Sequence, residues 1–392
     1  MADISPDPNS GAAGTEYQTM QALRRSGHEV DELWSDALPH KIEHGNLHYL
    51  LELPRAYRDA MEERVKRKQY DVVHVNQPHG YLAAKALSKS KSRPVFIHRS
   101  HGFELRVAAD LKPWMQKYDD DDRALPRRLA SKAIAQALYH NCRSIARYAD
   151  GHIVSASQCG QFLHEQMGVP IERIAVIPQA AADSFLARPA SAMTPERLNH
   201  ILYVGQFAFF KAPMIVAEAM NLLSRADEKM QFTWVCSREH HPQVRELLTG
   251  DARDRVRLLD WMSQEELMRV YDSHGAFLFP SFFEGFGKVF LEAMSRGLCV
   301  IAADNSGAHD VIVNDVNGIL TPTGNIEAMT QACLALITDH EAAARLSTAA
   351  VDTSRSYSWD RVARETVAFY ENRLQAKAQL SGSLDFQSST AL

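Results

Sequence analysis

One stretch of the chain, residues 276–303, constrains its fold more than any other. The apolar run at 276–279 is typical of a strand that is buried on both faces. Gly285 and Gly287 then precede a helical pattern, and a second apolar run follows at 299–303. Strand, loop, helix and strand in this order indicate a parallel sheet, so the predicted fold class is α/β. In an open parallel sheet the ligand crevice lies at the carboxyl ends of the strands, where this loop would sit.

The loop and the helix after it have residues suited to a sugar bound through a diphosphate. Backbone N–H groups at a helix start are unpaired and positive, and Gly285 and Gly287 let an anion approach them. Glu284 stands at the mouth of this loop, and Glu292 lies about one turn into the helix with its side chain leaning back toward the start. Because two carboxylates would repel a phosphate, we expect them to face sugar and ribose hydroxyls.

The run from Pro280 to Gly297 reads P-S-x-x-E-G-F-G-x-x-x-L-E-A-M-x-x-G. It resembles the signature of the retaining, nucleotide-sugar-dependent GT-B glycosyltransferases of family 4. The resemblance implies two doubly wound Rossmann-like domains that face a cleft, with a C-terminal helix that crosses back. It also implies that Glu292 holds the donor ribose, Glu284 the donor sugar, and the backbone of Phe286 and Gly287 the diphosphate. The alternative is a structural strand-loop-helix with surface acids.

A second motif, Gly205–Lys211, follows the apolar run at 201–204. In the family this segment reads G-R-x-x-x-x-K, and the arginine and the lysine both bind the donor diphosphate. Lys211 matches the pattern, whereas Gln206 replaces the arginine and removes one charge, because glutamine donates hydrogen bonds but cannot neutralise an anion. Trp261 follows another expected strand, where the family places the nucleotide base; it would either stack on that base or lie in the core.

The N-terminal part has two candidate ligand-binding positions. Gly11 and Gly14 form a glycine loop before a helix expected from about Thr15 to Ser26, which resembles the family's first loop near the donor diphosphate and the acceptor; an ordinary turn is the alternative. Only 2–4 could form a strand before it, so we expect either an upstream start or a shortened central strand. His101 follows an expected strand, and the resemblance assigns it to the donor hexose; a structural histidine is the alternative.

The expected domains follow from these motifs. An acceptor-side domain spans 1–186, with further strands expected at 30–33 (a weak one), 71–75, 94–98, 151–157 and 174–178. A nucleotide-sugar-binding domain spans 187–354 and begins with a linker rich in Ala, Pro and Ser. A returning helix is expected at 355–374, and a disordered tail rich in Ser and Gln at 375–392.

Composition narrows the function. The chain has 392 residues and a formal net charge of −5, which argues against general nucleic-acid binding. It has no signal-like leader and no apolar run of spanning length, so we expect a cytoplasmic protein. The five scattered cysteines are expected to be buried thiols. No D-x-D motif with apolar flanks stands out, so we expect no metal and no cofactor apart from the nucleotide sugar as co-substrate.

Residues 123–147 hold six Lys or Arg and no Asp or Glu, with apolar residues at near-helical spacing. The structural interpretation is a surface helix packed on its sheet. The functional interpretation is a site for an anionic acceptor, or for the anionic inner face of a membrane. An acidic run, Asp119–Asp122, precedes this segment and is expected to be a loop.

The sequence therefore predicts a glycosyltransferase that moves a hexose-type sugar from a nucleoside-diphosphate sugar to a glycan, a lipid-linked acceptor or a small molecule. Retention follows from the resemblance, with departure and attack on the same face. Glu284, His101 and Lys211 are the expected catalytic residues. Two alternatives stay open: a nucleotide-sugar epimerase of the same fold, and a protein that binds a nucleotide sugar or a partner without catalysis.

Overall fold

The structure is a computed structural model that describes residues 11–43, 45–90, 92–102, 104–118 and 125–389, without the side chains of Asn46, Glu104, 125–131 and 380–389. The chain forms two compact units, which we describe separately. Unit 1 comprises Met1–Pro178 and Asp360–Leu392, and unit 2 comprises Gln179–Trp359. The expected strand at 2–4 and the acidic run at 119–122 lie outside the described residues.

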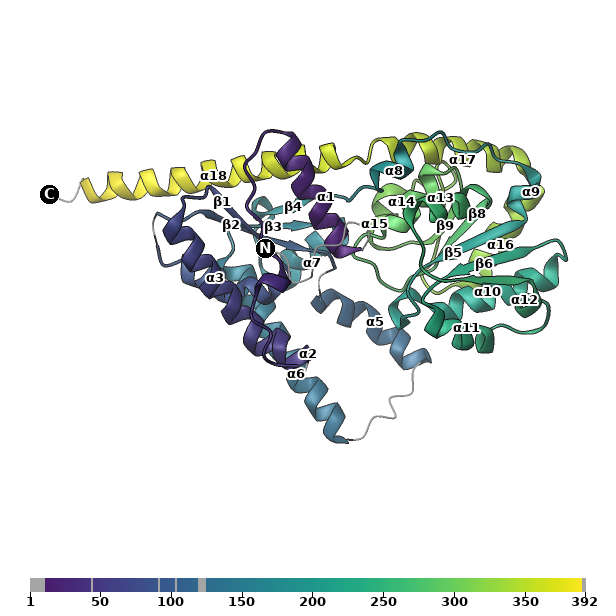
Figure 1. Cartoon of the computed structure of the whole chain (residues 1–392), viewed down its shortest axis with the longest axis horizontal. Helices are drawn as coiled ribbons and strands as arrows, with labels where there is room; N and C mark the ends of the chain where they lie inside the picture. Colours follow the sequence, from purple (N-terminus) through teal and green to yellow (C-terminus); the bar gives the residue numbers. More distant parts are fainter. Residues whose placement is uncertain (1–10, 44, 91, 103, 119–124, 390–392) are drawn as a thin grey trace. The chain divides into compact units, whose positions relative to one another are not determined.

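Unit 1 is built on a parallel sheet with the order β1-β2-β3-β4 (Figure 1). Its strands are β1 (Val72–Asn76), β2 (Val95–Ser100), β3 (Gly151–Val154) and β4 (Ile174–Val176). Its longer helices are α1 (Ala12–Arg25), α3 (Leu53–Arg67), α4 (Tyr81–Leu87), α5 (Glu104–Tyr118), α6 (Leu125–Tyr148), α7 (Ser157–Met167) and α18 (Trp359–Ser389). The four longer strands expected between 71 and 178 are thus confirmed.

The prediction of a weak strand at 30–33 is wrong, since these residues form no strand in the described part of the chain. Their polar side chains are held individually instead. Asp31 pairs with Lys68 at 2.9 Å and accepts a hydrogen bond from Tyr70 at 2.7 Å. Leu33 turns inward and packs against Leu53 and Tyr57. These side-chain contacts replace the ladder that an alternating pattern would have required.

Unit 2 has a six-stranded parallel sheet with the order β10-β9-β8-β5-β6-β7. The strands are β5 (His200–Val204), β6 (Gln231–Val235), β7 (Val256–Leu259), β8 (Ala276–Phe279), β9 (Cys299–Ala303) and β10 (Ile319–Thr321). The chain builds outward from β5 through β6 and β7, then returns to the other side of β5 with β8. The strand order therefore reverses between β5 and β8, which is where open α/β sheets bind ligands.

Helices cover both faces of the sheet in unit 2 (Figure 1). They are α8 (Asp183–Leu186), α9 (Pro195–Leu198), α10 (Pro213–Ala226), α11 (His241–Leu247), α12 (Gly250–Arg255), α13 (Gln264–Asp272), α14 (Lys288–Ser295), α15 (Ser306–Val311), α16 (Ile326–Thr338) and α17 (His340–Arg355). A capping box is present at the start of α13, where Ser263 and Glu266 bond reciprocally. All five cysteines are free and buried, as expected.

The boundary between the units falls earlier in the chain than the sequence suggested. The linker expected from Ala187 belongs to unit 2, where buried guanidinium groups hold its backbone. Arg296 donates to the carbonyl oxygens of Arg188 and Pro189 at 2.9 and 2.8 Å. Arg197 donates to Ser191 and Ala192 at 2.6 and 2.8 Å. A segment rich in Ala, Pro and Ser is thus ordered by long-range contacts that its composition does not reveal.

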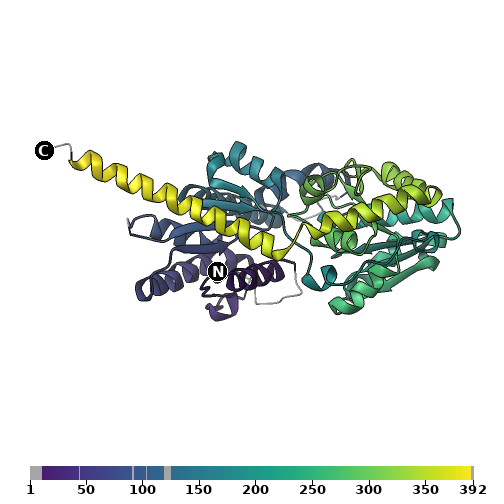
Figure 2. The same ribbon diagram turned by 90° about the horizontal axis from the view of Figure 1, so that it is seen from above.

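The C-terminal helix α18 is longer than expected, since the structure continues it to Ser389 where the sequence suggested an end near Leu374 and a disordered tail. Gln375–Leu380 contains mostly good helix formers and no glycine or proline, which favours continuation. Lys377 also donates to the carbonyl oxygen of Arg93. Figure 2 shows α18 running over the strands of unit 1, with its last turns extending past them.

Within the described residues, none of the helices has the length and apolar character needed to cross a membrane.

Candidate functional site

The corner between β8 and α14 has the strand-loop-helix form that the sequence predicts. Gly287 precedes α14 in a left-handed conformation with φ 96°. A Cβ atom at this position would come within 2.3 Å of the Phe279 ring, so only glycine fits here. Phe279, Phe286 and Phe290 belong to the buried core of unit 2 and anchor the loop from below. The loop backbone is thereby held at the carboxyl end of β8.

Lys211 and Glu284 come together at the point where the strand order reverses. Lys211 ends a short 3₁₀ turn after β5, Glu284 lies after β8, and Lys211 Nζ is 2.5 Å from Glu284 Oε1. The same carboxylate oxygen accepts a hydrogen bond from Ser281 Oγ at 2.8 Å. Both side chains are largely buried, at 17% and 8% exposure. Two residues that the sequence assigned to the donor site separately thus form one charged pair.

Neighbouring residues that the sequence analysis did not single out support this pair. The backbone N–H of Glu284 donates to Ser306 Oγ at 3.2 Å, and Asn305 Nδ2 donates to the carbonyl oxygen of Ser281 at 2.8 Å. Ser306 has a positive φ of 49°, which is uncommon for a residue other than glycine. A Cβ atom at Gly307 would come within 2.4 Å of the Phe286 carbonyl oxygen. The only sequence signal for these contacts was the polar loop after residue 303.

Glu292 lies on α14 beside the buried ring of Tyr271. The Tyr271 hydroxyl donates to Glu292 Oε2 at 3.3 Å. Burial raises the pKa of Glu292, and the charge of Lys288 together with the Tyr271 hydroxyl opposes this effect. A carboxylate that keeps its charge in such surroundings is stabilised by hydroxyl groups that donate hydrogen bonds to it. This fits the predicted role of Glu292, which is to bind the ribose hydroxyls of the donor.

Two further positions near β5 and β7 face solvent. Gly205 is buried directly after β5, and Gln206 is exposed beside it. Trp261 is 49% exposed, so the alternative that it is a core tryptophan is wrong. Its place after β7 leaves its ring available for stacking.

The expected N-terminal glycine loop is shorter than the sequence suggested. Helix α1 begins at Ala12, so Gly14 lies inside its first turn and is buried, while Gly11 remains exposed in front of it. Thr15 Oγ1 donates to the Gly11 carbonyl oxygen at 2.8 Å, which closes this first turn. Ala12 and Ala13 favour the earlier start. Of the two loop glycines, only Gly11 stands where a ligand could approach a helix start.

His101 of unit 1 lies in a buried charged cluster. It directly follows β2, and its Nε2 is 2.8 Å from Oε1 of Glu16 on α1, with side-chain exposures of 9% and 7%. The fully buried Arg99 places its Nε 3.6 Å from the same oxygen, and its Nη1 donates to Thr19 Oγ1 at 3.1 Å. Burial alone would raise the pKa of Glu16, but Arg99, His101 and His74 together bring it well below its usual value.

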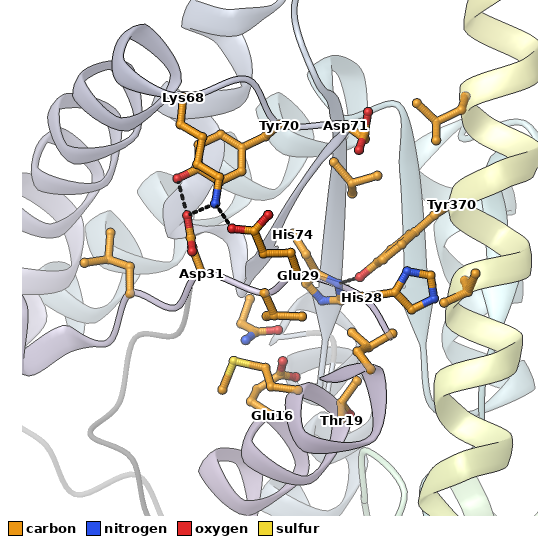
Figure 3. A pocket seen from close by; sticks show the side chains of 18 of the residues that line it. Glu16, Thr19, His28, Glu29, Asp31, Lys68, Tyr70, Asp71, His74 and Tyr370 are labelled. Atoms are coloured by element: carbon orange, nitrogen blue, oxygen red, sulfur yellow. Dashed lines mark hydrogen bonds and ion pairs between the residues drawn. The ribbon is translucent and has the colours of Figure 1, made fainter. Parts of the chain in front are cut away.

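A cavity of about 430 Å³ lies next to this cluster (Figure 3). It is beside β1, the edge strand of the sheet in the described part of unit 1. Glu16, Thr19 and His74 line its inner side, and His74 is hydrogen-bonded to the Tyr370 hydroxyl from α18. Burial lowers the pKa of His74 to about 3. On the outer side, Lys68 binds Asp31 and Glu29. Glu16 therefore stands between this cavity and His101.

Several predicted residues carry no side-chain description. Arg127 and Arg128 of the basic segment 123–147 lie on α6, but their side chains are outside the described part; Arg123 lies outside it altogether. Where side chains are described, no group of three or more His, Cys, Asp or Glu could hold a metal ion.

Two units with parallel sheets, the second with a charged pair and a glycine corner at its strand-order reversal, have the architecture of the GT-B fold. Two family models match the chain: Glycosyltransferase Family 4 over residues 10–182 and Glycosyl transferases group 1 over residues 199–339. The chain belongs to this family of glycosyltransferases.

Relatives agree with this assignment. The D-inositol 3-phosphate glycosyltransferase of Corynebacterium glutamicum (strain R) is 25% identical over 334 residues, covering 79% of this chain and 74% of the relative. The sucrose-phosphate synthase of Thermosynechococcus elongatus has the same fold, with a TM-score of 0.73, 19% identity and coverage of 96% and 99% of the two chains. Anabaena HepE, solved with UDP and glucose, aligns with a TM-score of 0.63, 16% identity and coverage of 94% and 97%.

Proposed function

We propose that this glycosyltransferase moves a hexose-type sugar from a nucleoside-diphosphate sugar to an acceptor hydroxyl, with retention of configuration and without a metal ion. The observation that carries the proposal is the Lys211–Glu284 pair at the strand-order reversal of unit 2, beside the backbone of Phe286 and Gly287. A cation, a carboxylate and helix-start amides suit the three parts of such a donor. The UDP and glucose bound to HepE, which shares this fold, support the same class of donor.

Each site residue has a separate role in this proposal. Lys211 and the amides at the start of α14 bind the diphosphate, and Glu292 accepts hydrogen bonds from the ribose hydroxyls. Glu284 binds hydroxyls of the donor sugar, and His101 is proposed as a further donor-hexose residue. Gly205 keeps the loop after β5 close to the sheet; a Cβ atom there would come within 2.6 Å of the Tyr203 hydroxyl.

Gln206 leaves the diphosphate with one cation fewer than the family pattern provides. A further cation lies at the same corner, because Lys288 is the first residue of α14 and its charge acts on Glu292 one turn later. A lysine at a helix start adds to the positive end of the helix dipole. We therefore assign to Lys288 part of the charge that Gln206 cannot supply.

The proposed reaction takes place on one face of the donor sugar. The bond between C1 and the diphosphate oxygen breaks, the acceptor oxygen bonds to C1 from the same side, and the acceptor proton passes to the departing phosphate. Lys211 and the α14 amides stabilise the charge that grows on the diphosphate. This leaves Glu284 to orient the sugar, since its carboxylate is already paired with Lys211 and accepts from Ser281.

We propose the acceptor only by its chemical class, which is a glycan, a lipid-linked acceptor or a small molecule such as the inositol phosphate in the relative's name. For a lipid-linked acceptor, we propose that the basic residues of 123–147 hold the enzyme at an anionic membrane. Each such residue near the surface contributes roughly 1 kcal/mol, screened by salt. Co-sedimentation with vesicles tests this. We expect the protein to bind anionic but not neutral vesicles, and binding to decrease as salt rises and on charge reversal of Arg127 and Arg128. Protein that stays in the supernatant at low salt refutes it.

One experiment separates the proposed activity from its alternatives. The protein is incubated with a panel of nucleotide sugars labelled in the sugar, together with candidate acceptors. Label transferred to an acceptor supports the proposal, label in an isomeric nucleotide sugar supports the epimerase, and binding without conversion supports the non-catalytic alternative. A Lys211→Ala variant is the control, because loss of the diphosphate cation should abolish transfer without unfolding unit 2.

A further inference from the structure

The charged cluster of unit 1 contains a residue to which neither the motifs nor the comparisons give a role. Glu16 lies on α1, far in the chain from β2, yet its carboxylate contacts both Arg99 and His101. The carboxylate is buried, and its pKa is depressed, so it is ionised at neutral pH. A buried charge of this kind is costly unless it is paired, and Arg99 provides the compensating charge.

The contact between Glu16 and His101 involves only one nitrogen of the histidine ring, Nε2, and does not involve Nδ1. Nε2 of His101 lies 2.8 Å from the carboxylate, without the alignment of a full hydrogen bond, while Nδ1 is buried and has no hydrogen-bond partner in the described part of the chain. Buried polar atoms in native proteins are almost always paired, so an unpaired ring nitrogen can take a partner such as a substrate hydroxyl. Because the carboxylate draws Nε2 toward α1, the ring presents Nδ1 elsewhere.

We propose that Glu16 is a positioning residue, which holds the His101 ring so that Nδ1 is available to a substrate hydroxyl. Arg99 serves the same purpose indirectly: it neutralises Glu16 and is itself fixed by Thr19. The groups that face this cluster are Arg99 from β2, His101 after it, His74 from β1 and the Tyr370 hydroxyl bonded to His74. This inference rests on the proposed function, since it assigns His101 to the donor sugar.

A kinetic double-mutant cycle tests the inference. Glu16→Gln keeps the size of the side chain and removes its charge. We expect kcat for transfer to fall about 10- to 100-fold, because a loosened ring loses its productive orientation. The dissociation constant of free nucleoside diphosphate, which contacts unit 2, should stay within about two-fold. In a His101→Ala background, Glu16→Gln should change kcat less than about two-fold, since a residue that acts through the ring has no effect without it.

The chain offers a matched control in the same unit. His48 and Glu52 form another Glu–His contact in unit 1, with Nδ1 2.9 Å from Oε2 and side-chain exposures of 7% and 13%. Glu52→Gln should leave kcat unchanged, which separates loss of any Glu–His pair from loss of this one. If Glu16→Gln does not fold, Glu16→Asp keeps the charge that Arg99 requires and withdraws it from the ring by one methylene. This variant should show the same decrease in kcat.

Failure of the inference can be told apart from failure of the proposed function. If the wild-type protein transfers no sugar from any donor, the proposed function is wrong. If the wild type is active and the folded Glu16→Gln or Glu16→Asp variant matches its kcat, the inference alone is overturned. Equal decreases in kcat on Glu16→Gln in the presence and absence of His101 would also overturn it, since Glu16 would then act independently of the ring.

Discussion

Lys211 Nζ lies 2.5 Å from Glu284 Oε1, so the cation expected to bind the donor diphosphate is paired with the carboxylate expected to bind the donor sugar. If Lys211 binds the diphosphate as proposed, an arriving diphosphate has to compete with this carboxylate for the lysine. On this assignment the pair should lower the affinity for free nucleoside diphosphate, while it holds the carboxylate in place for the sugar.

Replacing Glu284 with glutamine separates these two effects. Because the neutral amide no longer compensates Lys211, free nucleoside diphosphate should bind about 3- to 10-fold more tightly, as measured by calorimetry. Turnover should fall about 100-fold or more, since a charged contact to the reacting sugar is lost. Glu218→Gln, which breaks an exposed pair with Arg225 on α10, is the control. Weaker diphosphate binding by Glu284→Gln would contradict competition within the pair.

The Glu292 carboxylate should favour nucleotide binding but lower the stability of the folded protein at neutral pH. Glu292→Ala should weaken nucleoside diphosphate binding by roughly 1.5–3 kcal/mol, because a charged acceptor for ribose hydroxyls is lost. Burial raises the pKa of Glu292, so its stabilising contribution is present below the unfolded-state pKa and is lost as the pH rises through the folded-state value. Glu292→Gln should therefore raise the unfolding temperature at pH 7. Unchanged affinity in a folded variant would remove Glu292 from the ribose site.

The charge missing at Gln206 should limit catalysis. Gln206→Arg should raise kcat about 10-fold with little effect on the unfolding temperature, because the side chain is exposed. Lys288→Ala should lower kcat and diphosphate affinity, and Gln206→Arg should restore part of both in that background. Gln161→Arg on an exposed face of α7 is the matched control. A loss of activity in Gln206→Arg would mean that the glutamine is adapted to its donor.

A buried histidine pair should make unit 1 sensitive to acid. His98 Nδ1 lies 3.1 Å from His152 Nδ1, and burial lowers the pKa of His98 to about 3 and that of His152 well below its usual value. The unfolded chain takes up these protons near pH 6.5, whereas the native state does not. The free energy of unfolding should therefore fall as pH drops below 6.5, by up to about 1.4 kcal/mol per unit and histidine.

Urea unfolding at pH 7 and pH 5.5, followed by a probe in unit 1, measures this dependence. His98→Asn should show a shallower decrease than the wild type, because one depressed histidine is gone. His164→Gln, at an exposed position of α7, should behave like the wild type. If stability is the same at both pH values, the pair does not stay neutral in the native state.

The sequence predicted the strand-loop-helix corner because its determinants are local: two apolar runs, two glycines and the spacing of Glu284 and Glu292. It also placed Lys211 and His101 at strand ends, where parallel sheets bind ligands. The pairing of Lys211 with Glu284 depends on β5 and β8 being neighbours, which only the sheet order reveals. Glu16 was not predicted for the same reason, since its partners Arg99 and His101 come from a distant strand.

The remaining differences also come from long-range contacts. Arg197 and Arg296 hold the segment that composition suggested as a linker, and Lys377 contacts Arg93 where a tail was expected. Trp261 is exposed although an isolated tryptophan in a sequence suggests a core position as readily. In each case the residue type allowed both outcomes, and the neighbours brought by the fold decided between them.

The central claim is a retaining transfer that uses the donor site of unit 2 without a metal. The most direct measurement incubates wild-type protein with an accepted nucleotide sugar, labelled at C1, and an acceptor, with and without a chelator, and determines the anomeric configuration of the product by NMR. We expect a product with the configuration of the donor, formed at the same rate with chelator, and no product from Lys211→Ala. An inverted product, a chelator-sensitive rate, or full activity of Lys211→Ala would contradict the account.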